Sequence, residues 1–258
     1  MNEIIGDTAR AVAFLSRLPV PDRYFSDETA PAAQSSRAYA LAGIVVALPA
    51  AIAFFVLLAL GLAPLFAAAL AVLCQMLTTG ALHEDGLADC ADGFWGGRDR
   101  DSVLSIMKDS TIGAYGGLAL IMSALLRVAG LAAIASGTDA ASSALALIAV
   151  AATSRAAMVW HWHILPAAKP DGVAASAGRP DGDAMVFAAL TGAAIAFVLG
   201  LPASGIAGAI SMLVLAAIVC SGFSRIAGSK IGGHTGDTIG ATQQICEIAS
   251  LLGLALWV

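Results

Sequence analysis

Long apolar segments separated by short polar loops limit most strongly how this chain can fold. A helix that crosses a bilayer needs about 20 predominantly apolar residues. Seven segments meet this requirement: 39–62, 64–82, 113–135, 142–162, 184–201, 203–223 and 238–258. Only 12% of the 258 residues are charged, against roughly 25% in ordinary soluble domains. The sequence therefore predicts an all-α, polytopic membrane bundle of about seven transmembrane helices, forming a single integral membrane domain over residues 1–258.

The segment before the first apolar stretch has a different pattern. Residues 8–18 place apolar side chains at helical spacing with Arg10 and Arg17 among them, and Pro19 and Pro21 follow. This pattern is typical of an amphipathic helix that lies in the membrane interface. We predict an N-terminal interfacial helix within a cytoplasmic or interfacial segment over residues 1–37.

The basic residues indicate the orientation. Eleven of the 13 Lys and Arg residues fall in alternate loops, on one side of the predicted membrane: Arg10, Arg17, Arg23, Arg37, Arg98, Arg100, Lys108, Lys169, Arg179, Arg225 and Lys230. Cytoplasmic loops carry an excess of Lys and Arg. We therefore expect the N-terminus in the cytoplasm and the C-terminus outside, with the lipid bilayer as a partner. No dense basic run is present, which argues against nucleic acid as a partner.

The densest acidic stretch follows the second apolar segment, where residues 83–93 read His-Glu-Asp-Gly-Leu-Ala-Asp-Cys-Ala-Asp-Gly. If a helix continues through it, Asp85, Asp89 and Asp92 share one face. No Lys or Arg within the stretch neutralises them, and oxygen ligands favour Mg²⁺ or Mn²⁺, which often bridge carboxylates to phosphates. The alternative is a solvated acidic helix end. Because acids near membrane depth are costly, we favour a metal site.

This stretch begins a cytoplasmic loop over residues 83–112 that we predict to be catalytic. The loop continues through a short amphipathic helix to Lys108 and Asp109, and a Gly-rich turn with Gly116 opens the third segment. Backbone amides at a helix N-terminus, with Lys108 nearby, suit a phosphate. Asp109 is a further candidate metal ligand. The alternative is that these glycines only permit a turn.

A second polar cluster, residues 230–240, enters the last apolar segment from the same side. It contains Lys230, and its glycines, Gly233 and Gly236 among them, allow close backbone approach. Asp237 or His234 can serve as a base or bind a second metal ion. The alternative for Asp237 is a plain helix N-cap.

One arginine lies inside an apolar segment on the cytoplasmic side. A buried guanidinium such as that of Arg155 needs an anionic partner. The sequence offers two: the acidic residues described above, or a phosphate of a substrate.

These motifs together resemble one enzyme family. Residues 83–93, Lys108-Asp109-Ser110, Gly116-Gly117, the stretch 232–241 and the segment 18–21 resemble the adenosylcobinamide-GDP ribazoletransferase family, also called cobalamin 5'-phosphate synthase. The resemblance extends over nearly the whole chain. It implies an enzyme of the cytoplasmic (inner) membrane, with its active site facing the cytoplasm. The implied reaction is Mg²⁺-dependent transfer of the cobinamide phosphate moiety of adenosylcobinamide-GDP to alpha-ribazole or alpha-ribazole 5'-phosphate, with release of GMP.

Phosphoryl chemistry of this kind depends mainly on positioning and charge neutralisation. We assign the residues accordingly: Asp85, Asp89, Asp92 and Asp109 to Mg²⁺, Asp237 to the base, Arg155 and Lys108 to catalytic phosphate contacts, and Lys230, Gly233, Gly236 and Gly116 to substrate binding.

Two other functions deserve comparison. Residues 89–93 match the opening DxxDG of the CDP-alcohol phosphotransferases, but the rest of that pattern is absent. A secondary transporter places its key charges near the bilayer midplane, whereas nearly all the charges here lie on one side. The sequence leaves the oligomeric state open, a homo-oligomer included.

Overall fold

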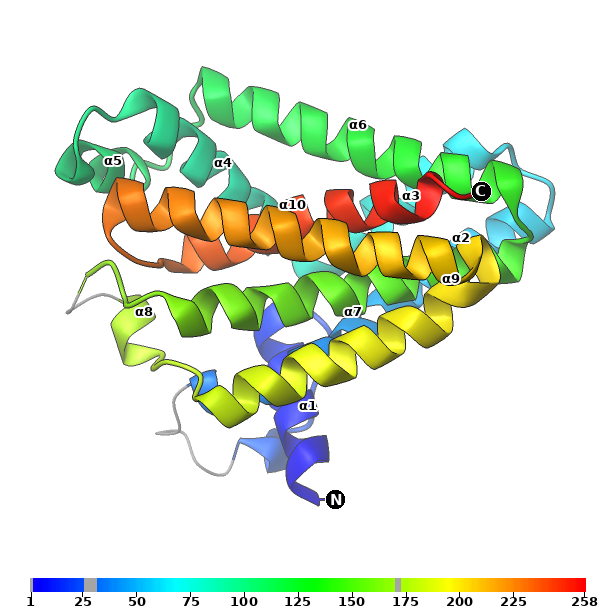
Figure 1. The fold of residues 1–258 in the computed structure, drawn as a ribbon, viewed down its shortest axis with the longest axis horizontal. Helices are drawn as coiled ribbons and strands as arrows, with labels where there is room; N and C mark the ends of the chain where they lie inside the picture. The colour runs from blue at the N-terminus through cyan, green and yellow to red at the C-terminus, as the bar shows by residue number, and fades with distance from the viewer. Residues whose placement is uncertain (1, 26–31, 170–172) are drawn as a thin grey trace.

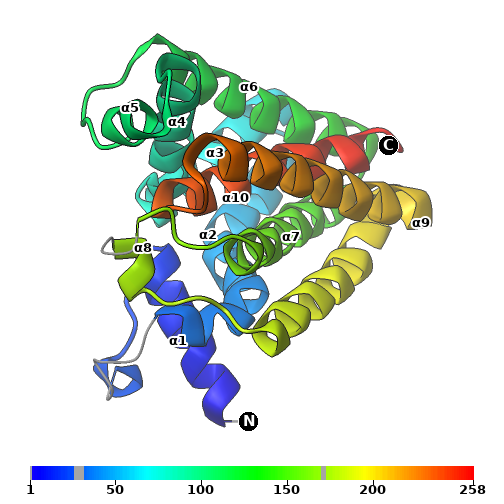
Figure 2. The same ribbon diagram turned by 60° about the vertical axis from the view of Figure 1, so that its left-hand side comes forward.

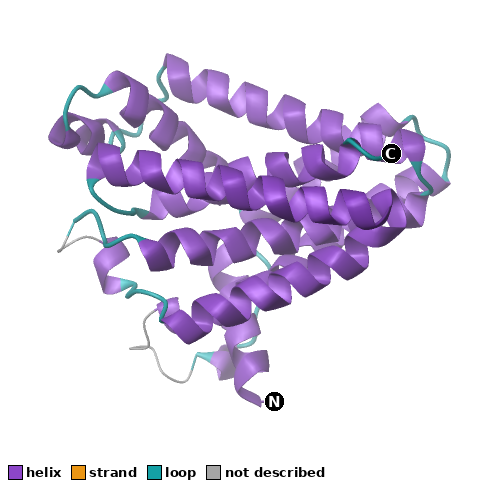
Figure 3. Cartoon of the chain, viewed as in Figure 1, coloured by secondary structure: helices purple, strands orange, loops and turns teal. Residues whose placement is uncertain are grey.

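The structure is a computed structural model that describes residues 2–25, 32–169 and 173–258. Residues 1 and 26–31 of the predicted N-terminal segment lie outside the described residues. The described part is helical and has no β-strand; one isolated bridge joins Ala167 and His234 (Figure 3). In chain order its helices are α1 (Asn2–Leu15), η1 (Asp22–Tyr24), η2 (Ala32–Ala38), α2 (Tyr39–Ala59), α3 (Pro64–Thr79), α4 (Leu82–Gly96), α5 (Arg100–Ile106), α6 (Ala114–Gly137), α7 (Ala140–Ile164), α8 (Val173–Ser176), α9 (Gly182–Ile231) and α10 (Gly236–Ala255).

Helix α7 lies at the centre of the bundle and packs against α2, α9 and α10 (Figure 1). It is the most buried of the long apolar helices that the structure describes. Its buried residues include five alanines and three serines, and such small side chains let neighbouring backbones approach closely. A Cβ atom on Gly43 of α2, for example, would lie 2.8 Å from the carbonyl oxygen of Ala151.

The predicted all-α membrane bundle is confirmed. Within the described residues, four helices are long and apolar enough to cross a membrane, and the pair α3 and α4 makes a fifth if it is counted as one broken span. The seven predicted segments fall on α2, α3, α6, α7, the two halves of α9, and α10. The difference in number arises because α9 counts as one helix of 50 residues, α3 is short, and Gln243, Gln244 and Glu247 make α10 more polar than a typical span.

Helix α9 is in fact two helices that meet at a sharp kink. Gly205 has φ 64° and ψ −169°, a conformation that only glycine adopts readily. In Figures 1 and 2 the two limbs of α9 run from one end of the bundle to the other and back. The boundary expected between segments 184–201 and 203–223 therefore corresponds to this kink, and no loop separates the two helices.

The sequence suggested that one helix continues from the second apolar segment through the acidic stretch. In the structure the acidic helix α4 is separate from α3. The axes of α3 and α4 differ by 91°. Two consecutive residues at the bend, Gly80 and Ala81, are left-handed, with φ of 65° and 58°. Gly80 is the C-cap of α3, with its amide bonded to the carbonyl of Leu77. Helix α4 therefore begins anew beyond the bend, where it packs against α10 and α6.

The N-terminal helix α1 covers part of the bundle near that bend. It ends at Leu15, earlier than expected, because the amide of Arg17 donates to the carbonyl of Thr78 at the end of α3 instead of continuing the helix. Ala11, Val12 and Leu15 are buried, whereas Phe14 is half exposed. The amphipathic character predicted for this segment is present.

The connections cluster at two ends of the bundle. Helices α4, α5 and α8 and the turn from α9 to α10 lie at one end, and the C-terminus lies at the other (Figures 1 and 2). The polar motifs recognised in the sequence therefore share one end.

Candidate active site at one end of the bundle

A cavity of about 400 Å³ lies where α4, α5, α7 and α10 meet under α1. Asp85 and Asp237 line it from α4 and from the first turn of α10, and Lys108 and Lys169 line it from the loops. The rest of its wall is mainly apolar: Phe14, Leu15, Leu82, Leu104, Met107, Met158, Trp162 and Ile239. Acidic groups, basic groups and an apolar surface thus meet in one space.

Four carboxylates interact around this cavity. Partial burial raises the pKa of Asp89 to about 7, and the negative charges of Asp237, Asp85 and Asp92 contribute to the rise. Burial also raises the pKa of Asp237, with a further contribution from the charge of Asp85 and opposition from a hydrogen bond with Thr235. The predicted triad thus shares one electrostatic environment, and Asp237 belongs to it.

The carboxylates do not form a ready-made metal site. Among the described residues, no three His, Cys, Asp or Glu side chains lie close enough together to hold an ion. Asp109 is exposed, and its carboxylate accepts a hydrogen bond from the amide of Thr111, a local contact. The chemistry of the donor set nevertheless suits a hard divalent cation, because all four interacting groups offer carboxylate oxygens.

Asp92 makes a contact that the sequence analysis did not foresee. Its two oxygens accept hydrogen bonds from the amides of Gly113, at 2.7 Å, and Gly116, at 2.9 Å, at the N-terminus of α6. A Cβ atom at either glycine would collide with the Asp92 carboxylate, so a larger residue at either position would displace this carboxylate from the two amides. The amides that we assigned to a phosphate are therefore occupied by Asp92, which places its charge at the positive end of the α6 dipole.

Asp237 is not the N-cap of α10. That position belongs to Thr235, whose hydroxyl accepts a hydrogen bond from the amide of Thr238, and the Thr238 hydroxyl accepts from the amide of Thr235 in return. The plain N-cap interpretation of Asp237 is therefore wrong. Its carboxylate faces the cavity and is free of a capping role.

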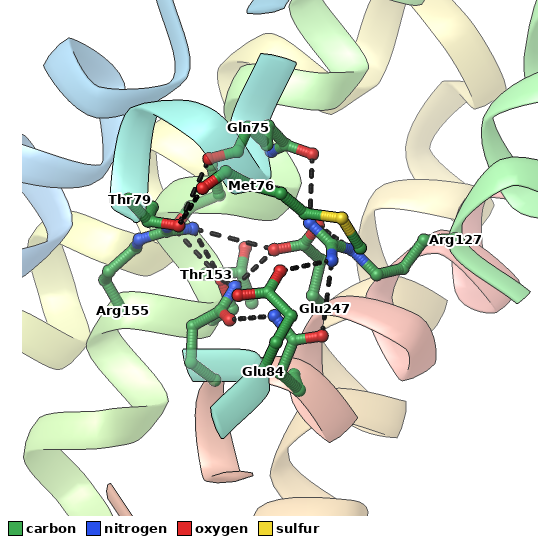
Figure 4. A network of polar contacts seen from close by, with 12 residues as sticks. Gln75, Met76, Thr79, Glu84, Arg127, Thr153, Arg155 and Glu247 are labelled. Atoms are coloured by element: carbon green, nitrogen blue, oxygen red, sulfur yellow. Dashed lines mark hydrogen bonds and ion pairs between the residues drawn. The ribbon is translucent and has the colours of Figure 1, made fainter. Parts of the chain in front are cut away.

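Arg155 does not reach the acidic cluster. It lies in a separate buried network, and its Nη1 is 3.6 Å from Glu247 of α10 (Figure 4). The centre of that network is Arg127 of α6, which is 2% exposed and forms ion pairs with Glu84, at 2.7 Å, and Glu247, at 2.9 Å. Arg127 also donates to Gln75 and Gln244. The partner of Arg155 is thus Glu247, and not the acidic stretch 83–93 or a substrate phosphate, the two partners considered from the sequence.

Comparisons with known proteins cover nearly the whole chain. The sequence model of the cobalamin-5-phosphate synthase family matches residues 7–255. The chain belongs to this family. Relatives named adenosylcobinamide-GDP ribazoletransferase occur in Sinorhizobium medicae (52% identical over 99% of this chain and 98% of the relative), Rhizobium meliloti (54%, 99% and 98%) and Brucella ovis (43%, 99% and 98%). No solved structure matches the chain.

Lys108, which the sequence assigned to a phosphate contact, is exposed and lines the cavity. Lys169, which the sequence analysis did not select, lines the same cavity, and the positive charge of Lys108 helps to lower the pKa of Lys169 after a larger contribution from desolvation. A loop lysine that is distant in sequence gives no periodic signal, so only the fold brings this pair together.

Of three further assignments, Lys230 and Gly233 have contacts within the protein, whereas Gly236 lines the cavity. Lys230 donates to the carbonyl of Phe94, at 2.6 Å, near the C-terminal end of α4. The helix dipole favours a cation at this end. Gly233 permits close contact between two loops, because a Cβ atom there would collide with Pro166. Gly236 is exposed and lines the cavity. Of the residues assigned to substrate binding, Gly236 is therefore the one whose position suits a ligand best.

The roles of Glu84, Arg127 and Glu247 were not predicted from the sequence. Each is an ionisable residue within or beside an apolar segment, which is the usual sign of a functional or paired group in a membrane protein. That signal was available for Arg127 and Glu247, but nothing in the sequence showed that α6 and α10 place them together.

Proposed function

We propose that this protein transfers the cobinamide phosphate moiety of adenosylcobinamide-GDP to alpha-ribazole or its 5'-phosphate, releasing GMP, with Mg²⁺ as cofactor. The observation that carries the proposal is the group of four interacting acids around Asp89, beside a cavity that also presents Lys108 and Lys169. Such a combination suits a substrate that carries both a diphosphate and a reactive hydroxyl. The relatives' name supports the same reaction.

Asp85, Asp89 and Asp92 would hold Mg²⁺, and Asp237 would stay free to act as the base. When bound, the ion neutralises charge on the diphosphate oxygens and orients them. Since no three carboxylates meet among the residues that the structure describes, binding requires side-chain rotations, which aspartate rotamers permit. Asp109 remains a proposed ligand only if the loop after α5 moves towards the others.

The protein's own groups account for the remaining steps. A hydroxyl of the ribazole attacks the phosphorus that bears the cobinamide, and the bond to the GMP oxygen breaks. Asp237 is placed to take the hydroxyl proton, and its raised pKa suits a general base better than that of an ordinary aspartate. Lys108 and Lys169 are placed to balance phosphate charge at the edge of the cavity.

We also propose that the protein lies in the inner membrane with its N-terminus in the cytoplasm, its C-terminus outside and this site facing the cytoplasm. The support is the distribution of Lys and Arg among the loops. Cysteine labelling of a variant with a single cysteine at Val258 tests this orientation: the residue should react with a reagent that does not cross the membrane.

The reaction is tested by measuring GMP release from the purified protein. The assay contains adenosylcobinamide-GDP, alpha-ribazole and Mg²⁺, and a parallel sample contains EDTA. We expect GMP and cobalamin in equal amounts with Mg²⁺ and neither with EDTA. Full activity in EDTA would contradict the role of the metal, and no GMP under any condition would contradict the transfer itself.

The raised pKa of Asp89 predicts how the Mg²⁺ requirement changes with pH. A pKa of about 7 means that Asp89 is mostly protonated at pH 6 and ionised at pH 8 when no metal is bound. Because a ligand carboxylate must be ionised, the Mg²⁺ concentration for half-maximal GMP release should be roughly tenfold higher at pH 6 than at pH 8. Mg²⁺ titrations at the two pH values check this. An equal half-saturating concentration at both would argue against Asp89 as a ligand.

A further inference from the structure

The cavity has an apolar side to which the proposed mechanism gives no task. Phe14 and Leu15 from α1 and Met158 and Trp162 from α7 belong to this apolar part of the lining, which also includes Asp85 and Asp237. The mechanism needs only the acids and the lysines. An apolar wall that shares a cavity with reactive groups is the usual arrangement for holding the non-reacting part of a substrate.

Two aromatic rings, those of Phe14 and Trp162, belong to this wall, and the buried ring of Tyr39 behind it contacts both. The rings of Phe14 and Tyr39 stack with centroids 6.4 Å apart, and Tyr39 lies 6.2 Å from Trp162. The indole nitrogen of Trp162 donates to the carbonyl of Gly178, at 3.0 Å, so it needs no partner in the cavity. Phe14 is 52% exposed, although Leu15 beside it is fully buried. Flat apolar surface is thus available for another ring.

The substrates of the proposed reaction carry three ring systems. The corrin, a macrocycle with many amide side chains, is far larger than a cavity of about 400 Å³. Guanine carries hydrogen-bonding groups along its edge, and against Phe14, Leu15 and Met158 these would be left unpaired, which is unfavourable. The dimethylbenzimidazole base of alpha-ribazole has only carbon and hydrogen along its outer edge, so it matches the apolar wall.

We propose that this wall binds the aromatic base of the acceptor, alpha-ribazole, and so directs its ribose towards Asp85 and Asp237. The inference rests on the proposed function, because it names the place of one substrate in the same site. It gives α1 a task in substrate recognition, since Phe14 and Leu15 belong to that helix.

The test is Phe14→Ala, assayed for GMP release with each substrate varied in turn. We expect the KM for alpha-ribazole to rise roughly tenfold, as is typical when a stacking ring is lost. The KM for adenosylcobinamide-GDP and the rate at saturation should change by less than about twofold. Phe187→Ala is the matched control: Phe187 of α9 is also half exposed, and it lines a different cavity. It should leave both KM values unchanged.

Each other outcome has a clear meaning. A rise in the KM for adenosylcobinamide-GDP alone would place guanine on the wall and overturn the proposal, as would no change in either KM. If Phe14→Ala does not fold, Phe14→Leu replaces it: this variant keeps an apolar side chain but removes the flat ring, and it should also raise the KM for alpha-ribazole. Failure of the wild-type protein to release GMP would overturn the proposed function instead, so the two failures are distinguishable.

Discussion

Asp89→Asn should lower GMP release by roughly 10³-fold or more while the protein stays folded. Asparagine keeps the size and shape of the side chain but loses the charge that a divalent cation needs. Asp89 is the carboxylate whose pKa responds to all three of the other acids, so we regard it as the centre of the group. Its loss should therefore remove most of the affinity for Mg²⁺.

The same substitution should not destabilise the protein. The pKa of Asp89 is raised from 3.8 to about 7, so folding disfavours its ionised form, and above pH 7 that form reduces the stability of the native state. Asparagine removes this penalty. At pH 8 the unfolding temperature in detergent should be equal to or above that of the wild type.

Asp101→Asn is the matched control, because Asp101 is an exposed acid of α5 at the same end of the bundle. It should leave both activity and stability unchanged. Wild-type turnover by Asp89→Asn at ordinary Mg²⁺ concentrations would remove the metal assignment.

Arg127→Met should have the largest effect on stability. Arg127 neutralises two carboxylates that are almost entirely buried, those of Glu84 and Glu247. Removing one partner of a buried ion pair typically costs about 3–5 kcal/mol, because the other charge remains without compensation. Such a cost corresponds to a fall in unfolding temperature on the order of 10 °C. Thermal unfolding in detergent measures it.

Two further variants separate the buried charge from the loss of a long side chain. Arg127→Met combined with Glu84→Gln removes the positive charge together with the carboxylate that depends on it most, since Glu247 still has Arg155 as a neighbour. This pair should recover much of the lost stability. Arg98→Met removes an exposed arginine and should have little effect. If Arg127→Met unfolds at the wild-type temperature, the network does not stabilise the fold.

The sequence predicted the helical class and the gathering of the polar motifs on one side of the bundle. Apolar length and the distribution of charged residues are properties of the chain itself, so segments such as 39–62 and 142–162 correspond closely to α2 and α7. The spacing of Asp85, Asp89 and Asp92 also survived, because α4 is helical throughout that stretch.

What the sequence could not predict depends on contacts between distant segments. The bend before α4 requires a left-handed alanine, Ala81, a conformation that no local pattern favours. Asp92 binds the amides of Gly113 and Gly116 only because α6 begins beside α4. Lys230 and Arg155, both assigned to phosphate, instead have protein partners that come from other helices. Single-sequence reasoning identifies a charged group but does not choose among its partners.

The buried network also has a consequence for how the molecule is assembled. Glu84 is synthesised first, Arg127 and Arg155 follow, and Glu247 arrives last, on the final helix α10. Until α10 inserts, two guanidinium groups share one carboxylate inside an apolar environment, where an excess positive charge is unfavourable. Insertion of the last helix therefore completes the electroneutrality of the interior. Helices α6 and α7, although they are made earlier, therefore depend on α10 to neutralise their buried arginines.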